Sequence, residues 1–398
     1  MDPSATLLSL FASAAWIRAF EVLPGSDGRW TVRCVVEADR SADDLRGLLN
    51  ERAANLAEQV DVRIVTSLST TPDAAMSDAP APSPALAHCP AVALPGLAEL
   101  PQTLPDALRR AAQNDSAQSL VHVRADGSEK WQNFGDLLGE ASAVCGGLAK
   151  LGLKPGDSAL LLLDRSADVL PAFWGCLLGG IRPAIAQIPP TFTGENRGLE
   201  QLCKVWRLLD GPLLITKSNL LEPVRSLAGR LDVESVRTTD IASLLTSAPA
   251  NDTFAARPED TAFFSLTSGS TGVPKCIMLT HANIIQRAHG ANLLCGHTAE
   301  DVVLNWLPFD HIGSISDWHL RCVLLGCRMV YAEKESVIAR PLHWLDLIDK
   351  YRVTHTWAPN FAYSLVTSSL TTRPGNSPAP TWDLSCVDGM LTAGESVS

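Results

Sequence analysis

From about Leu97 to the end of the chain, segments with apolar residues at helical spacing alternate with short, continuously apolar runs. Within Gly135–Leu151 they recur at helical spacing, as expected for one buried helix face. Runs such as Ser158–Leu163 are short and continuously apolar, which is typical of a buried strand. Helices alternating with such strands predict a layered α/β domain. We expect strands at Ser158–Leu163, Arg182–Gln187, Asp260–Leu266, Val302–Leu307, Cys327–Tyr331, Val353–Trp357 and Ser385–Gly394, and helices at Leu104–Asn114, Gly135–Leu151, Val169–Leu178, Ala282–Leu294, Ser316–Leu325, Trp344–Tyr351 and Phe361–Leu370.

The first part of the chain has a different pattern. Strands are expected at Trp16–Leu23, Trp30–Glu37 and Val60–Leu68, with a helix at Ser41–Gln59 that Ser41 caps. Residues 1–69 are therefore predicted to form a small α/β unit of unknown role, either the tail of a preceding module or a docking piece. Residues 70–96 are rich in Ala, Pro and Ser and read as a linker to a domain at 97–398.

Composition narrows the possible functions. The chain has 398 residues, of which 46% are hydrophobic, and a formal net charge of −11. This acidic balance argues against a nucleic-acid partner, and the longest apolar runs are too short to span a bilayer. The ten cysteines are dispersed, mostly in apolar segments that include Cys295, and favour a reduced, cytoplasmic protein. His319, Cys322 and Cys327 suit a buried helix end, so we assign no metal ligand.

The stretch Phe264–Cys276 carries the clearest chemical signal. An apolar run leads into a loop with four hydroxyl residues, two glycines and Lys275. Glycines let the backbone approach a polyphosphate, hydroxyl and N–H groups donate hydrogen bonds to it, and lysine adds positive charge. A Walker loop needs glycine immediately before its lysine, whereas Pro274 stands there.

The order T-S-G-S-T-G-x-P-K resembles the phosphate-binding signature of the adenylate-forming superfamily, which comprises acyl-CoA synthetases, fatty acyl-AMP ligases and adenylation domains of peptide synthetases. Pro308–Ser314 resembles the family's P-x-x-H-x-x-G segment, offset by one residue, and Ala393-Gly394-Glu395 resembles its G-G-E turn. The resemblance covers roughly residues 97–398 and is closest to loading acyl-AMP ligases of hybrid polyketide–peptide synthases. Cys276 departs from the pattern, because it replaces the usual glycine after the lysine.

The resemblance implies a role for each matching residue. Lys275 would neutralise the leaving pyrophosphate and His311 would lie against the substrate carboxylate and α-phosphate, although a core histidine is the alternative for His311. Gly394 and Glu395 would contact adenine, unless they form a plain turn. The residues expected to hold the β- and γ-phosphates are Thr267, Ser268, Gly269, Ser270, Thr271 and Gly272, and the candidates for the acyl-pocket wall, which could equally be core residues, are Trp357, Asn360 and Tyr363.

The reaction implied is activation of a carboxylic acid by ATP to acyl-AMP, followed by transfer to the phosphopantetheine thiol of an acyl carrier protein. A fatty or related starter acid is expected, and a hydroxy or keto acid and an amino acid are the alternatives. The amino acid is least favoured, because near His311 no acidic residue beyond Asp310 and Asp317 is evidently placed for an α-ammonium group. The sequence stops at Ser398, before the motifs for the magnesium ligand, the ribose and the lid. We therefore expect residues 1–398 alone to be inactive in pyrophosphate exchange. The alternative is a non-catalytic adenylation-domain remnant or docking module.

Overall fold

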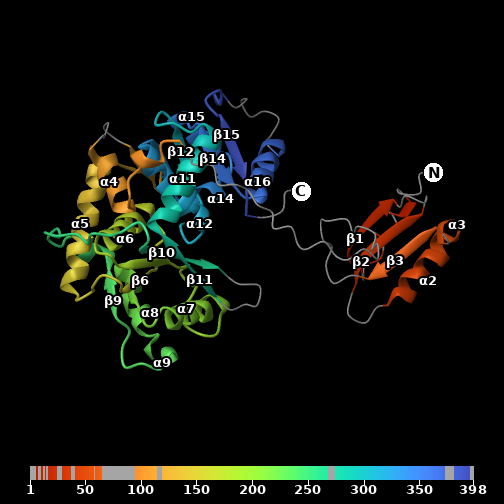
Figure 1. Cartoon of the computed structure of the whole chain (residues 1–398), viewed down its shortest axis with the longest axis horizontal. Helices are drawn as coiled ribbons and strands as arrows, with labels where there is room; N and C mark the ends of the chain where they lie inside the picture. Colours follow the sequence, from red (N-terminus) through yellow and green to blue (C-terminus); the bar gives the residue numbers. More distant parts are fainter. Residues whose placement is uncertain are drawn as a thin grey trace. The chain divides into compact units, whose positions relative to one another are not determined.

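The computed structural model describes residues 6–7, 10–11, 14, 17–24, 29–36, 41–57, 59–64, 95–113, 119–267, 274–372 and 381–394. The chain divides into two compact units, Met1–Pro90 and Ala91–Ser398 (Figure 1). Over the described residues, the strands form one sheet of three strands in the first unit and two sheets of six strands in the second. The predicted α/β fold class is confirmed.

The smaller unit packs helices on one three-stranded sheet. Strand β1 (Ile17–Pro24) pairs antiparallel with β2 (Trp30–Val36), and β2 pairs parallel with β3 (Val60–Ile64). Helix α2 (Ala42–Arg52) and helix α3 (Ala54–Ala57) connect the last two strands. Buried apolar side chains from strands and helices form the core of this unit.

The helix predicted at Ser41–Gln59 is interrupted. The Ser41 side chain accepts from the backbone N–H of Asp44, and the Asp44 carboxylate accepts from the Ser41 N–H, which forms a capping box. The first helix ends where Ala53 adopts φ −147° and ψ 46°, outside the helical region. The expectation of one continuous helix is therefore wrong, whereas its predicted start is confirmed.

In the larger unit, the first sheet has the strand order β11-β10-β7-β6-β8-β9, and the second has the order β15-β14-β12-β13-β4-β5. All neighbouring strands are parallel except β10–β11 and β4–β5 at the outer ends. The strands are β4 (Leu120–Val123), β5 (Glu129–Gln132), β6 (Ser158–Leu161), β7 (Arg182–Ile185), β8 (Leu213–Thr216), β9 (Thr238–Asp240), β10 (Thr261–Thr267), β11 (Lys275–Thr280), β12 (Val302–Asn305), β13 (Arg328–Ala332), β14 (His355–Ala358) and β15 (Gly389–Thr392).

Helices connect the parallel strands, as parallel pairing requires. Among the described residues, no helix combines the length and apolarity needed to cross a membrane. The helices are η1 (Leu97–Glu99), α4 (Leu104–Gln113), α5 (Phe134–Lys150), α6 (Ser166–Leu178), α7 (Arg197–Leu208), η2 (Ser218–Leu220), α8 (Leu221–Arg225), α9 (Ala228–Leu231), α10 (Ile241–Leu245), α11 (His281–Cys295), α12 (Ile312–Ile315), η3 (Ser316–Leu320), α13 (Arg321–Leu325), α14 (Lys334–Ala339), α15 (His343–Tyr351) and α16 (Asn360–Thr371).

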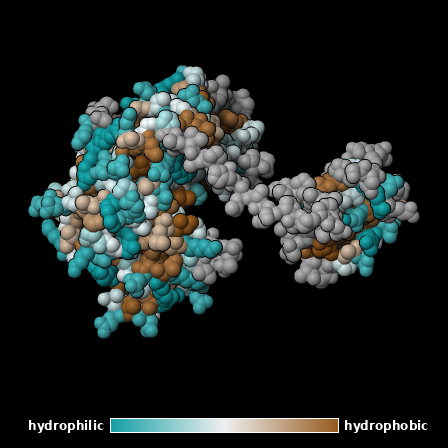
Figure 2. All heavy atoms as spheres, in the orientation of Figure 1, coloured by the Kyte–Doolittle hydropathy of each residue, from teal (hydrophilic) through white to brown (hydrophobic). Residues whose placement is uncertain are grey.

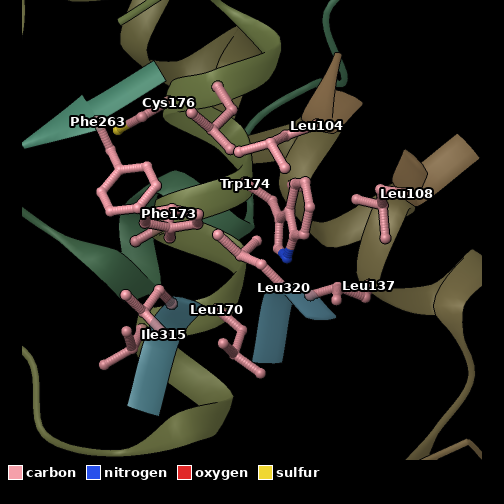
Figure 3. Packing of buried hydrophobic residues seen from close by; sticks show 14 of the residues in the cluster. Leu104, Leu108, Leu137, Leu170, Phe173, Trp174, Cys176, Phe263, Ile315 and Leu320 are labelled. Atoms are coloured by element: carbon pink, nitrogen blue, oxygen red, sulfur yellow. The ribbon is translucent and has the colours of Figure 1, made fainter. Parts of the chain in front are cut away.

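The largest core cluster joins the two six-stranded sheets. It combines apolar side chains from β6, β7 and β10 with others from β12, β13 and β14, and helices α4, α5 and α6 contribute to the same cluster. Figure 3 shows Phe173 and Trp174 of α6 between Phe263 of β10 and Leu320 of η3. The Trp174 indole N–H donates to His319 Nε2 at 2.8 Å, so the buried imidazole is satisfied within the core.

Two further clusters cover the outer faces of these sheets. Leu160 of β6 and Phe264 of β10 pack with residues of α7 and α8, whereas Leu304 of β12 and Ala358 of β14 pack with residues of α15 and α16. Because successive strand residues face opposite sides, each sheet is buried on both faces. The unit is therefore layered, with helices outside and between the two sheets.

Other element predictions need correction. The helix predicted at Ser316–Leu325 is the π-helical η3 followed by α13, and the strand predicted from Ser385 begins only at Gly389, after a turn in which Val387 N–H donates to Leu384 O. Cys295 is exposed at the end of α11 and does not lie in the core. The elements that were not predicted include the antiparallel pair β4–β5, strands β8 and β9, and helix α7.

Candidate active site

The predicted phosphate loop connects β10 with the edge strand β11. These strands pair antiparallel, and Thr267 at the end of β10 lies opposite Lys275 at the start of β11. Lys275 is exposed and Thr267 is half-buried. The hairpin thus brings together a hydroxyl and an ammonium group that are eight positions apart in sequence. Ser268, Gly269, Ser270, Thr271 and Gly272 lie outside the described residues.

A cavity of about 490 Å³ opens beside this hairpin. Thr267 and Pro274 line it from the hairpin, and Asp310 lines it from the segment after β12. Its far wall includes Gln187, Arg197, Gly198 and Gln201, where Arg197 is the exposed first residue of α7. Figure 2 shows apolar side chains of the larger unit gathered near β10 and β11, in a surface that is otherwise mostly hydrophilic. The cavity therefore offers both cationic and hydrogen-bonding groups next to the loop.

Asp310 is the carboxylate that lines this cavity. Burial raises the pKa of its carboxyl group, while its own backbone hydrogen bond and the positive charge of Lys334 act in the opposite direction. A cation that entered the cavity would favour the ionised form of Asp310. Sequence reasoning did not select this residue, although its position directly before His311 was a usable signal.

His311 caps the short helix α12. Its Nδ1 accepts the Gly313 N–H at 3.1 Å, and its ring lies 5.5 Å from the ring of Trp357. Trp357, at the penultimate position of β14, is buried, stacks on Trp318 at 5.8 Å and donates its indole N–H to Asn305 Oδ1 at 2.9 Å. The structure thus joins His311 and Trp357, two predicted site residues that are distant in sequence.

The lack of a side chain at Gly313 allows the rings of His311 and Trp357 to pack against this segment. A Cβ placed at this position would lie 2.8 Å from Trp357 Cη2 and 3.1 Å from His311 Nδ1. Distances below 3.0 Å are not tolerated without movement of a neighbour. Glycine is therefore required here for close approach, not for an unusual backbone conformation.

Asn305 is another residue that sequence reasoning missed. It ends β12, is 2% exposed and accepts both the Trp357 indole N–H and the Leu307 N–H, whereas its Nδ2 has no hydrogen-bond partner among the described residues. A buried amide N–H₂ without a partner is costly. Asn305 also lines a second cavity, of about 200 Å³, with residues of the loop after β12. The sequence did contain a signal for Asn305, namely an asparagine toward the end of a predicted apolar strand.

The other candidates lie elsewhere around β14 and β15. Tyr363 packs on Trp344 at 5.2 Å and donates its hydroxyl to Leu391 O at 2.9 Å, in the cluster on the outer face of the sheet. Asn360 is the half-buried first residue of α16. Gly394 has φ +92° and directly follows Ala393, whose N–H donates to Ala358 O. Glu395 lies outside the described residues.

The α/β fold agrees with comparisons to known proteins. The family model described as AMP-binding enzyme matches residues 108–398. The chain belongs to this family. The predicted membership of the adenylate-forming superfamily is thereby confirmed.

Curated relatives of this family member include fungal synthetases. Microperfuranone synthase of Emericella nidulans is 29% identical over 293 residues, which cover 72% of this chain and 30% of the relative. An atromentin synthetase of Paxillus involutus is 27% identical over 303 residues, covering 75% of this chain and 31% of the relative. The chain thus spans about a third of the length of the curated relatives that it matches.

Similar solved structures include adenylation domains. The adenylation domain of a keto acid-selecting NRPS module, bound to a keto acyl adenylate, matches with a TM-score of 0.70 and 34% identity, covering 76% of this chain and 53% of that chain. McyG A-PCP complexed with phenylalanyl-adenylate matches with a TM-score of 0.69 and 32% identity, covering 74% and 53%. A fatty acyl-adenylate ligase from L. pneumophila shares the fold, with a TM-score of 0.65 and 23% identity over 75% and 50% of the two chains.

Proposed function

We propose that this chain provides the nucleotide- and acid-binding part of an adenylation domain that converts a carboxylic acid and ATP to acyl-AMP and pyrophosphate. The observation that carries the proposal is the β10–β11 hairpin, which sets Thr267 opposite Lys275 beside the cavity that Asp310 and Arg197 line. Polyphosphate binding requires such a combination of hydroxyl donors and cations.

The proposed reaction is attack of the substrate carboxylate on the α-phosphorus of ATP. One carboxylate oxygen forms the new O–P bond while the bond to the pyrophosphate oxygen breaks. Both reactants are anions, so positive charge and oriented donors supply most of the rate enhancement. Lys275 accompanies the leaving pyrophosphate, and His311 lies beside the reacting carboxylate. The phosphates would carry Mg²⁺, which suits a cation that is usually held by phosphate oxygens and one or two carboxylates.

The two halves of the proposed site come from different sheets. Thr267 and Lys275 belong to the first sheet, whereas His311 follows β12 and Trp357 lies in β14 of the second. Phe309 and Asp310 bridge them, because the segment after β12 shares a small pocket with Phe263 and Leu266 of β10. We propose that ATP phosphates occupy the hairpin side and that the acid occupies the side of His311 and Trp357.

We further propose a 2-keto acid as the preferred substrate class. Support comes from the higher identity to the keto acid-selecting domain, 34%, than to the fatty acyl-adenylate ligase, 23%. The indole and imidazole groups of Trp357 and His311 would border a small planar acid better than a long alkyl chain. Transfer of the acyl group to the phosphopantetheine thiol of a carrier protein would follow. We place the reaction in the cytoplasm, because all nine cysteines among the described residues are free thiols and six of them are buried.

Pyrophosphate exchange by the full-length protein tests the proposal. We expect ATP–pyrophosphate exchange with aliphatic or aromatic 2-keto acids at least about tenfold above that with the matching amino acids or with fatty acids. Preference for fatty acids would overturn the keto-acid assignment alone. Nucleotide binding without exchange for any acid would instead favour a non-catalytic remnant and refute the proposed reaction.

A further inference from the structure

Three side chains of types that can ligate a metal meet at the N-terminal ends of β12 and β14, away from the proposed active site. His297 follows the C-terminal end of α11, Asp301 directly precedes β12, and His355 is the first residue of β14. The proposed site residues Asn305 and Trp357 lie toward the opposite ends of the same two strands. Figure 1 labels α11, β12 and β14 close together in the larger unit. The cluster is therefore separate from the adenylation chemistry.

The side-chain geometry resembles a set of ligands without their ion. One ligand atom from each residue lies within 4.8 Å of the others. His297 Nδ1 is 3.5 Å from Asp301 Oδ2, and His355 Nδ1 is 3.5 Å from Asp301 Oδ1. Two donors on a tetrahedral zinc ion, with bonds of about 2.0–2.1 Å, are separated by roughly 3.4 Å. The His297–Asp301 separation fits shared coordination of one ion better than a direct hydrogen bond. His355 Nδ1 also lies 2.9 Å from the Thr354 hydroxyl and would exchange that contact for the ion.

Burial makes the arrangement costly without an occupant. The side chains of His297 and Asp301 are each 10% exposed, and that of His355 is 14% exposed. The Nδ1 atom of His297 has no hydrogen-bond partner among the described residues. An unsatisfied buried polar atom costs free energy that a bound ion would recover.

We propose that His297, Asp301 and His355 bind one divalent transition-metal ion, most readily Zn²⁺, in a structural site that ties α11 to β12 and β14. Two imidazoles and one carboxylate form a donor set that suits zinc. With three protein ligands, a water molecule would take the fourth position of a tetrahedral ion. The ion would thus stabilise the sheet rather than act on the acid.

Neighbouring groups hold the three ligands in place. The Thr298 N–H donates to Asp301 Oδ2 at 2.9 Å, and the Thr354 hydroxyl donates to Asp301 Oδ1 at 3.0 Å and lies 2.9 Å from His355 Nδ1. Such outer contacts orient ligands in known metal sites. Gly389 of the adjacent strand leaves space for the imidazole, because a Cβ there would lie 2.8 Å from His355 Cδ2.

The charges around the cluster also permit a cation. The Asp301 carboxylate has an oxygen 3.5 Å from Nδ1 of His297 and another 3.5 Å from Nδ1 of His355, and its negative charge favours a bound cation. The positive charge of Arg321 opposes cation binding, while its guanidinium is held by hydrogen bonds to Asp317 O and Asn292 Oδ1. The carboxylate of Asp388 adds a second negative charge near His355, which favours a cation.

Zinc binding to the purified chain tests the proposal. The chain is stripped with a chelator, dialysed against Zn²⁺ and analysed for metal content and melting temperature, in parallel with His297→Ala and His355→Ala. His343→Ala is the matched control, since His343 Nδ1 lies 3.6 Å from Asp346 Oδ2 and the described part of the chain adds no third ligand there. We expect the wild type and the control to retain one Zn²⁺ more per chain than either ligand variant, with at least about 100-fold tighter binding.

Two further measurements keep the result interpretable. His297→Gln preserves size and polarity, so it serves if an alanine variant fails to fold, and circular dichroism checks each fold. Co²⁺ replaces Zn²⁺ as a spectroscopic probe, and the visible absorption of four-coordinate cobalt is expected in the wild type and absent from the ligand variants. Equal zinc stoichiometry and affinity in the wild type and folded ligand variants would overturn the proposal, as would failure of the wild type to bind zinc.

Discussion

Replacing Gly313 with alanine provides a sharp test of how the candidate site is packed. The added methyl group would lie 2.8 Å from Trp357 Cη2, closer than a real Cβ contact allows. Trp357 cannot easily move away, because it is 3% exposed, is stacked on Trp318 and is hydrogen-bonded to Asn305 at 2.9 Å. Crowding of this kind in a packed core typically costs about 1–3 kcal/mol.

The expected magnitude can be converted to a melting temperature. A unit as large as Ala91–Ser398 has a large unfolding entropy, so each kcal/mol lowers the melting temperature by only about 1.5 °C. We therefore expect Gly313→Ala to lower the melting temperature by about 2–5 °C and the free energy of unfolding in urea by about 1–3 kcal/mol. Gly139→Ala is the matched control, because Gly139 lies inside α5 with no atom within 4 Å of an added Cβ. This control should be neutral or slightly stabilising.

A double variant separates crowding from a general loss of stability. Trp357→Phe removes the atom that the new methyl group would meet, so Gly313→Ala should cost about 1 kcal/mol less in that background than in the wild type. Thermal and urea unfolding of the four proteins in this cycle measure the coupling. A melting temperature for Gly313→Ala equal to that of Gly139→Ala, or strictly additive effects, would refute the packing argument.

Three other predictions concern separate parts of the chain. Lys275→Ala should slow pyrophosphate exchange of the full-length protein by about tenfold or more. The melting temperature should change by less than about 1 °C, because the side chain is exposed. Lys204→Ala on the exposed side of α7 is the control, and unaltered kinetics in the Lys275 variant would contradict the assignment. Burial lowers the pKa of His281, whose Nδ1 accepts the Leu104 N–H at 3.1 Å, to about 4. Because its folded-state pKa lies below the unfolded value, His281 makes its full contribution to the free energy of unfolding above a pH of about 6.5. That contribution is lost as the pH falls toward about 4, by up to about 3 kcal/mol. His281→Gln should therefore flatten the pH dependence of urea unfolding in that window, and an unchanged slope would contradict the prediction. Limited proteolysis should first cut within residues 70–94, which are rich in Pro, Ala and Ser, and leave a stable larger fragment, whereas initial cuts inside 97–398 would argue against the predicted boundary.

Sequence analysis predicted the structural elements that are determined by a single local pattern. Helix α5 begins within one residue of its prediction, because Asn133 caps it and its apolar face repeats at helical spacing. The loop predicted to bind phosphate was selected because glycines, hydroxyls and a lysine follow one another directly. Of the two strands that flank it, β10 was predicted and β11 was not. Family membership followed from the same local motif.

Features that depend on contacts between distant residues were missed. The hydrogen bond from Trp357 to Asn305 joins neighbouring strands, and no periodicity links two residues 52 positions apart. The same holds for His297, Asp301 and His355, which two parallel strands and a helix end bring together. Helix α7 was overlooked although its N-terminal residue Arg197 lines the cavity beside the loop. Predicting that such residues lie close together requires the strand order and register of the sheet, which local sequence patterns do not supply.

The edge position of β11 has a consequence for how such a domain can evolve. Among the described strands, β11 pairs with β10 alone, so residues of the hairpin can change without altering another of these strand pairings. The residues proposed to face the acid follow β12 or lie in β14, in the interior of the other sheet. Under the proposed function, substitutions that select a new acid would fall in one sheet, and the nucleotide-binding hairpin would be inherited unchanged in the other. A library that varies positions around Trp357 and Gly313 should therefore yield variants with altered acid preference and an unaltered Michaelis constant for ATP.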